Sequence, residues 1–250
     1  MSCLALCKLA LKNLAIWPLQ QFRRLRALQR AQPESNVVTY FEVMLAHGAL
    51  GKRYYLNSSR LGLPVSNELK VLNVINSIKG DTFIDIGSCY GGHAFTLADN
   101  FKRVIAFEPD EHNFGVLSTS IRLLNKRNIK PMRFAVSDHD GKITFYQGSS
   151  IFTHTTVQEF SPKAEGVITI PCMSLNNFVR GPIDLIKVDV QGAELNVLKG
   201  AKNVIDKINR WVVEVELSEL ENKGKVEAQL RDFGYNTKWI TIQHILGSRV

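Results

Sequence analysis

The chain has 250 residues, of which 45% are hydrophobic and 22% charged, so it can bury a full α/β core but leaves little room for a second large domain. Its mean hydropathy of -0.05 is typical of a globular chain. The net charge of +8 comes from residues 1–80, which hold 11 Lys and Arg against 3 Asp and Glu; residues 81–250 hold 20 of each, so the main domain lacks the summed basic charge of a nucleic-acid footprint.

A basic amphipathic segment is predicted at residues 1–32. The first 30 residues contain six Lys and Arg and no acid, and apolar residues recur at helical spacing from Leu4 to Leu14. Peripheral contact with an anionic membrane, a mitochondrial presequence and a solvated helix pair at the domain edge all fit this pattern. No stretch is long and uncharged enough to predict a membrane-spanning helix. Residues 33–66 are expected to form a connector.

Residues 67–250 are predicted to form one α/β domain, opened by a helix at 66–78. Strands and helices then alternate, which implies a mainly parallel sheet covered on both faces. A polar loop, Gly148–Gln158, separates two of the strands. The predicted strands are 82–87, 103–108, 132–137, 142–147, 167–171, 184–190, 210–217 and a β-like tail at 235–245; the predicted helices are 93–100, 110–128, 193–199 and 222–233.

The first strand ends in a glycine-containing turn, Asp85-Ile86-Gly87-Ser88-Cys89-Tyr90-Gly91-Gly92. Gly87 permits a tight turn, and Gly91 permits a close approach of backbone to a ligand. A dinucleotide fingerprint would need glycine at the position of Cys89, so a nicotinamide oxidoreductase is disfavoured. The turn predicts that Asp85, Gly87, Ser88 and Gly91 bind a cofactor; a simple strand-to-helix connection is the alternative.

Glu108 ends the next strand, 21 residues after Gly87. A carboxylate at this place can accept hydrogen bonds from both hydroxyls of a ribose, although it could also face the dipole of the following helix. Asp138 follows the third predicted strand and could accept from an adenine amino group, or be an ordinary turn residue. An adenosine ligand without a pyrophosphate fits this set, and S-adenosyl-L-methionine meets that description.

The segment IKVDVQGAE at 186–194 makes the chain resemble the FkbM family of S-adenosylmethionine-dependent methyltransferases. The family's hallmark reads roughly K-x-D-x-E-G-x-E followed by V-L-x-G, and Gln191 stands here where the hallmark has its first acid of the turn. FIDIGSCYGG is similar to the family's D-x-G-A-N-x-G turn. The resemblance covers about Asn67 to Leu246, and the matching hallmark residues are Lys187, Asp189, Gly192, Glu194, Val197, Leu198 and Gly200.

The resemblance implies a class I methyltransferase (Rossmann-like) fold with a seven-stranded, mainly parallel sheet, one strand of which is antiparallel near the C-terminus. It also implies O-methylation of a hydroxyl on a sugar, glycan or small metabolite. A helical N-terminal extension is expected in front of this fold.

Catalytic candidates lie where the acceptor would meet the methyl group. Asp189 ends the central strand and is expected to bind cofactor and to contact the acceptor or act as base. Glu194, Glu216 and His154 are further candidates, although Glu194 could simply cap its helix. Buried Lys187 is expected to form a structural ion pair with Asp85 or Glu214.

The four cysteines form no CxxC pair and no Cys/His cluster with zinc-ligand spacing, so no metal site is predicted. They favour a reducing, cytoplasmic compartment, with peripheral membrane contact through residues 1–30 left open. An RNA methyltransferase that uses the basic front, and a non-catalytic, membrane-associated S-adenosylmethionine-binding protein, are the alternatives. The sequence does not indicate an oligomeric state.

Overall fold

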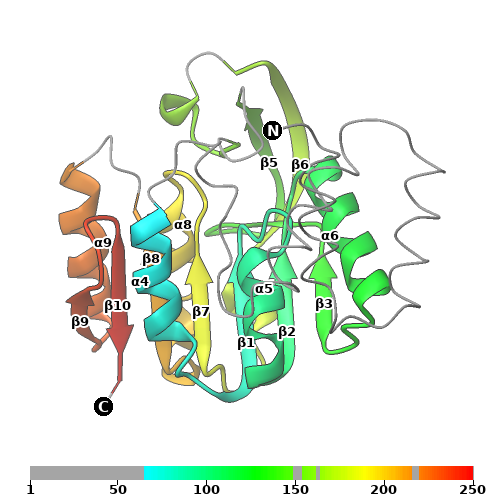
Figure 1. Ribbon diagram of the computed structural model, residues 1–250. Helices are drawn as coiled ribbons and strands as arrows, with labels where there is room; N and C mark the ends of the chain where they lie inside the picture. The colour runs from blue at the N-terminus through cyan, green and yellow to red at the C-terminus, as the bar shows by residue number, and fades with distance from the viewer. Residues whose placement is uncertain (1–64, 149–153, 162–163, 216–219, 250) are drawn as a thin grey trace.

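The computed structural model describes residues 65–148, 154–161, 164–215 and 220–249 (Figure 1). The predicted basic segment, 1–32, therefore lies outside the described residues, as do nearly all of the connector and the catalytic candidate Glu216. The domain boundaries assigned from the sequence remain predictions.

A seven-stranded sheet forms the centre of the described fold, in the order β3-β2-β1-β7-β8-β10-β9. β10 runs antiparallel to both of its neighbours, and the other adjacent pairs are parallel. This confirms the expected mainly parallel sheet with one antiparallel strand near the C-terminus. The strands are β1 (Gly80–Ile86), β2 (Phe101–Phe107), β3 (Ile129–Met132), β7 (Leu185–Val188), β8 (Arg210–Glu214), β9 (Asn236–Trp239) and β10 (His244–Ser248).

Helices cover both faces of this sheet, as the alternation of elements predicts. In Figure 1 the helices α4, α5 and α6 lie in front of the strands, whereas α8 and α9 lie behind them. Successive strand residues point to opposite faces, so Phe83 packs in the α4–α5–α6 layer and Ile84 in the α8–α9 layer. The helices are α4 (Val65–Ile75), α5 (Gly92–Leu97), α6 (Glu111–Leu124), α7 (Leu175–Phe178), α8 (Glu194–Lys199) and α9 (Leu220–Asp232), with 3₁₀ turns at Ala98–Asn100, Gln158–Phe160 and Lys202–Lys207.

The local sequence sets the limits of α6. Its N-cap is Asp110, whose carboxylate accepts a hydrogen bond from the backbone N–H of Asn113 at 2.9 Å. The helix ends at Asn125, which adopts the left-handed conformation with φ 53°. The helix predicted at 110–128 is therefore confirmed, but it is shorter at its C-terminal end.

A second, three-stranded sheet in the order β4-β6-β5 lies beyond the carboxyl edge of the large one. The segment predicted as one strand at 132–137 belongs to two sheets, because the chain leaves the large sheet after Met132 and pairs again as β4 beside β6. The prediction of one continuous strand was wrong, since a run of β-forming residues does not reveal which sheet each part joins. The strands are β4 (Ala135–Val136), β5 (Gly141–Gln147) and β6 (Gly166–Met173).

Among the described residues, no helix combines the length and the apolar character needed to cross a bilayer.

Candidate active site

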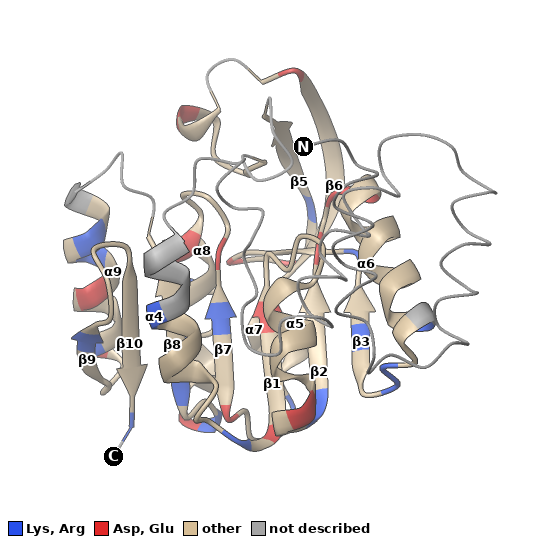
Figure 2. Ribbon diagram, in the orientation of Figure 1, with Lys and Arg blue, Asp and Glu red and all other residues tan. Residues whose placement is uncertain are grey.

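The carboxyl ends of β2, β1 and β7 lie side by side and bring three predicted acids to one edge of the sheet. Asp85 is the second-last residue of β1, Glu108 directly follows β2, and Asp189 directly follows β7. Figure 2 shows acidic segments near the upper ends of β1 and β7, next to the basic segment of β7. Ligands of open α/β sheets bind at such an edge, where the strand order reverses.

Backbone contacts fix the turn between β1 and α5. The N–H groups of Gly87 and Ser88 both donate to the carbonyl oxygen of Phe107, at 3.0 and 2.9 Å. Gly87 has φ 79°, and a Cβ at this position would lie 1.8 Å from the carbonyl oxygen of Asp189. Glycine is therefore required here both by conformation and by the close approach of β7, as the sequence predicts for a tight turn.

Asp85 lies buried beneath this turn. Its Oδ2 accepts a hydrogen bond from the backbone N–H of Ala94 at 3.1 Å, whereas its Oδ1 has no hydrogen-bond partner among the described residues. Burial raises the pKa of Asp85, and the charges of His93 and Lys187 oppose that rise. A buried carboxylate oxygen without a partner is costly, so Oδ1 is suited to accept a donor from a ligand.

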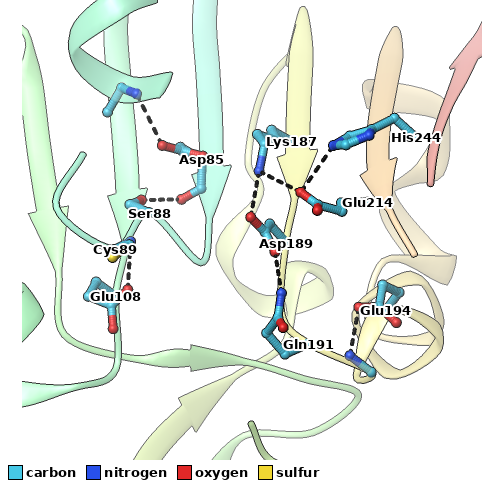
Figure 3. A network of polar contacts seen from close by, with 12 residues as sticks. Asp85, Ser88, Cys89, Glu108, Lys187, Asp189, Gln191, Glu194, Glu214 and His244 are labelled. Atoms are coloured by element: carbon cyan, nitrogen blue, oxygen red, sulfur yellow. Dashed lines mark hydrogen bonds and ion pairs between the residues drawn. The ribbon is translucent and has the colours of Figure 1, made fainter. Parts of the chain in front are cut away.

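The Glu108 carboxylate is held by two backbone groups on either side of it. Oε2 accepts from the N–H of Cys89 at 2.7 Å, and Oε1 accepts from the N–H of Asp110 at 2.9 Å. Burial raises the pKa of Glu108 to about 8 despite these two donors. Cys89 adopts a positive φ of 49° at this point, so the turn presents its N–H toward the acid (Figure 3).

Asp110 links the site to the small sheet, a role that the sequence did not suggest. Its Oδ2 accepts from Nε2 of Gln147 at 3.1 Å and lies 3.9 Å from Nε2 of His154. Nδ1 of His154 accepts a hydrogen bond from the N–H of Gly148 at 3.0 Å. This bond puts the proton of a neutral His154 on Nε2, facing Asp110, and burial lowers the pKa of the ring. These contacts favour a role for His154 in holding its loop in place, and its catalytic role remains a prediction.

The described side-chain contacts of Asp138 are with its neighbours in the chain, Ser137 and His139. The Asp138 side chain is exposed, and its Oδ1 contacts Nδ1 of His139 at 2.7 Å, a hydrogen bond that lowers the pKa of Asp138. The backbone of Ser137 and Asp138 packs against Gly200, at the C-terminal end of α8. No described contact joins Asp138 to Asp85, Glu108 or Asp189, so its adenine-binding role remains a prediction without support from this geometry.

Lys187 is fully buried and joins two acids on neighbouring strands. Its Nζ lies 3.1 Å from Oδ2 of Asp189 and 4.0 Å from Oε2 of Glu214. The predicted pairing with Glu214 is therefore present, and Asp85 lies beside Lys187 in the strand register. Of these two acids Asp189, directly after the same strand, lies nearer.

Glu214 has a second partner, which comes from the antiparallel strand β10. His244 faces Glu214 in the strand register, and its Nε2 lies 3.0 Å from Oε2 of Glu214. Figure 3 shows Asp189, Lys187, Glu214 and His244 as one continuous group. His244 was not predicted as a site residue: it stands in the run ITIQHILG, but its partner depends on the register of β10 against β8.

The hallmark turn after β7 is covered by the loop that carries His154. Oγ1 of Thr155 donates to the carbonyl oxygen of Gln191 at 2.7 Å, and the ring of Phe160 lies where a Cβ on Gly192 would be. Glu194 is buried, and its Oε1 accepts from the N–H of Gly192 at 2.8 Å. Glu194 thus stabilises the turn that precedes α8, and its catalytic role remains a prediction.

Sequence comparisons match the chain to methyltransferases. Residues 85–237 match the family model of the methyltransferase FkbM domain. The hexuronic acid methyltransferase AglP of Haloferax volcanii is 32% identical over 139 residues, which are 54% of this chain and 56% of that protein. The chain thus aligns with little more than half the length of that relative.

Solved structures of methyltransferases resemble the chain at low sequence identity. The methyltransferase FkbM of Methylobacillus flagellatus has a TM-score of 0.48 and 16% identity, covering 92% of this chain and 59% of that one. The magnesium protoporphyrin IX methyltransferase of Synechocystis has a TM-score of 0.47 and 10% identity, covering 74% and 81%.

Proposed function

This chain belongs to the FkbM methyltransferase domain family, and on that premise we propose that it is an S-adenosylmethionine-dependent O-methyltransferase that acts on a sugar hydroxyl. The edge formed by β2, β1 and β7 is the proposed site. The observation that carries the proposal is the carboxylate of Glu108, held beside the Gly87 turn at the end of the neighbouring strand.

The described residues fit the methyl donor in three respects. The Gly87 turn brings the ends of β1 and β7 into close backbone contact at the proposed site, and Glu108 offers a carboxylate to ribose hydroxyls. Oδ1 of Asp85 is a buried acceptor without a partner among the described residues, which suits a donor such as an ammonium group. The donor supplies an activated methyl group for in-line displacement.

The protein's own contribution is to hold and orient the reactants. Positioning an acceptor oxygen in line can supply ~7–11 kcal/mol in favourable cases. Asp189 is only partly exposed, with 28% of its side chain accessible, and it lies at the strand end nearest the proposed methyl position. Its carboxylate is held by Lys187 and Gln191, so it is suited to orient an acceptor hydroxyl.

A hexuronic acid is the acceptor class that the comparisons favour. The relative from Haloferax volcanii is named for that substrate, and the aligned 139 residues are 54% of this chain. We therefore propose a uronic acid residue of a glycan as acceptor, in preference to RNA, because the domain at 81–250 carries no net basic charge.

Calorimetric titration with S-adenosylhomocysteine and with NAD tests the cofactor assignment. The wild type is expected to bind only the first ligand, and Glu108→Ala should weaken that binding by roughly 2–4 kcal/mol, because a carboxylate held for two hydroxyls is lost. Exposed Glu159→Ala is the matched control. Equal affinity of Glu108→Ala and wild type would remove Glu108 from the site, and transfer of labelled methyl to glucuronic or galacturonic acid tests the acceptor.

A further inference from the structure

Asp189 and Glu214, at the ends of β7 and β8, contact the same buried lysine but differ in their other hydrogen-bond partners. Lys187 is 1% exposed, whereas the side chains of Asp189 and Glu214 are 28% and 16% exposed, so both acids are reached from the same end of the sheet. Because Val188 pairs with Val213, the two acids are register neighbours.

Asp189 is bound on both oxygens. Lys187 Nζ contacts Oδ2 at 3.1 Å, and Nε2 of Gln191 donates to Oδ1 at 3.0 Å. Although burial raises the pKa of Asp189, Lys187 and Gln191 hold it below its usual value. A carboxylate in this state is a weak proton acceptor, and its donors fix its orientation.

Within the described part of the chain, the Glu214 carboxylate is contacted on one oxygen only. Its contacts with described residues, from Lys187 and His244, both involve Oε2, so Oε1 is left for another group. Burial and the neighbouring Asp189 charge raise the pKa of Glu214, against the effect of His244. Paired acids whose environments separate their proton affinities commonly divide the roles of base and charge stabiliser.

Hydrogen bonds around Thr241 assign the proton of His244. Oγ1 of Thr241 accepts from the backbone N–H groups of Gln243 and His244, each at 3.1 Å, so both of its lone pairs are used. Its own O–H then donates to Nδ1 of His244 at 2.8 Å. The neutral ring therefore carries its hydrogen on Nε2, on the side that faces Glu214.

We propose that Glu214 is the general base of the methyl transfer, that Asp189 orients the acceptor hydroxyl as a permanent carboxylate, and that His244 is a positioning residue that holds Glu214 by Oε2. This inference rests on the proposed function and names the base within the same site. The acceptor oxygen forms a bond to the methyl carbon while the carbon–sulfur bond breaks and its electron pair goes to sulfur. The hydroxyl proton goes to Oε1 of Glu214, and bulk water removes it after product release.

Methyl-transfer kinetics on the full chain, with glucuronic and galacturonic acids as acceptor probes, test the role of Glu214. Glu214→Gln is expected to lower kcat by ~100-fold or more, the effect of losing a general base, with the Kd for S-adenosylhomocysteine changed less than about twofold. The matched control is Glu227→Gln, which removes a carboxylate bonded to Arg231, Thr237 and Trp239 outside the site. Wild-type kcat in Glu214→Gln would overturn the proposal.

His244 variants separate positioning from a structural role. Glu214 is faced by Asp189 and Lys187 from β7 and by His244 from β10, with Asp85 one strand further away. His244→Phe removes the ring nitrogen that lies 3.0 Å from Oε2 and favours ionised Glu214, so the acidic limb of the kcat–pH profile should move to higher pH while kcat at high pH is retained. His244→Gln keeps a polar N–H group at this position and should return the acidic limb toward its wild-type pH. A uniform loss at every pH would refute the positioning role.

Carboxyl titration gives a readout that needs no acceptor. Carbon-13 NMR of the S-adenosylhomocysteine complex, with signals assigned by their loss in Glu214→Gln and Asp189→Asn, should show Glu214 titrating at higher pH than Asp189. The reverse order would overturn the inference. If the wild type binds S-adenosylhomocysteine but methylates neither uronic acid, the proposed acceptor fails, and the titration order still decides between the two acids.

Discussion

The two halves of the candidate site hold their acids by different means. On the β1–β2 side, Asp85 and Glu108 accept hydrogen bonds from backbone N–H groups, whose positions the turns fix. On the β7–β8–β10 side, Asp189 and Glu214 depend on the side chains of Lys187 and His244. Backbone donors fix the position of a carboxylate, whereas a shared buried cation also favours its ionised form. Substitutions should therefore act differently on the two sides of the site.

The largest effect is expected from Lys187→Met. Removing the buried cation leaves Asp189 and Glu214 as uncompensated neighbours, which should lower the free energy of unfolding by about 3–5 kcal/mol at pH 8. The loss should shrink at lower pH, because burial raises the pKa of Glu214 and its protonation removes one of the two uncompensated charges. Urea denaturation measures both values. Lys102→Met is the control, because its ion pair with Asp81 is exposed and should matter little; equal losses would contradict the dependence on a buried cation.

Gly87→Ala tests the backbone-held side. A methyl group would meet the carbonyl oxygen of Asp189 in a left-handed conformation, so we expect a loss of roughly 2–4 kcal/mol in stability together with weaker S-adenosylhomocysteine binding. Gly115→Ala, in the exposed middle of α6, meets no atom within 4 Å and should stabilise the protein by up to about 1 kcal/mol. Thermal unfolding of both variants gives the comparison, and a stable Gly87→Ala protein would refute the close contact.

The pH dependence of cofactor binding gives the next largest effect. The pKa of Glu108 is about 8 in the free protein, and donors from ribose hydroxyls should lower it in the complex. Binding then releases a proton, so affinity for S-adenosylhomocysteine should fall as the pH drops below 8, by up to about tenfold per pH unit. Calorimetry from pH 6 to 9 measures the slope, which Glu108→Gln should flatten. A flat wild-type profile would contradict this assignment.

The smallest effect is expected at the loop that covers the hallmark turn. Thr155→Val removes the hydrogen bond to the carbonyl oxygen of Gln191 and the one accepted from the N–H of Val157, at a cost of roughly 1–2 kcal/mol. Limited proteolysis of the loop should become faster, whereas the pH profile of cofactor binding should stay unchanged. Thr144→Val, on an exposed position of β5, is the matched control. A changed pH profile of cofactor binding in Thr155→Val would mean that the β1–β2 side and the β7–β8–β10 side of the site are not independent.

The sequence predicted those parts of the site that depend on a single strand and the turn after it. Asp85, Glu108 and Asp189 were found because each follows an apolar run, and parallel strands bring such ends together. His244 was missed because its contact with Glu214 depends on the register of an antiparallel pair, which no local pattern records. Asp138 was assigned to the end of a third strand of the large sheet, but the chain changes sheets after Met132. Pairing between distant segments is thus what the sequence did not reveal.

Gly87 and the carbonyl oxygen of Asp189 approach each other closely between the two sides of the proposed site. Because main chain meets main chain there, with no room even for a methyl group, the donor-side turn and the acceptor-side strand end form one rigid unit. We therefore expect variation around the proposed acceptor site to be best tolerated in the loop at 154–161, which meets this unit through the side chain of Thr155, and in the small sheet, which contacts Asp110 through Gln147. Libraries for redesign should be directed to those segments, with 85–91 and 187–192 kept intact.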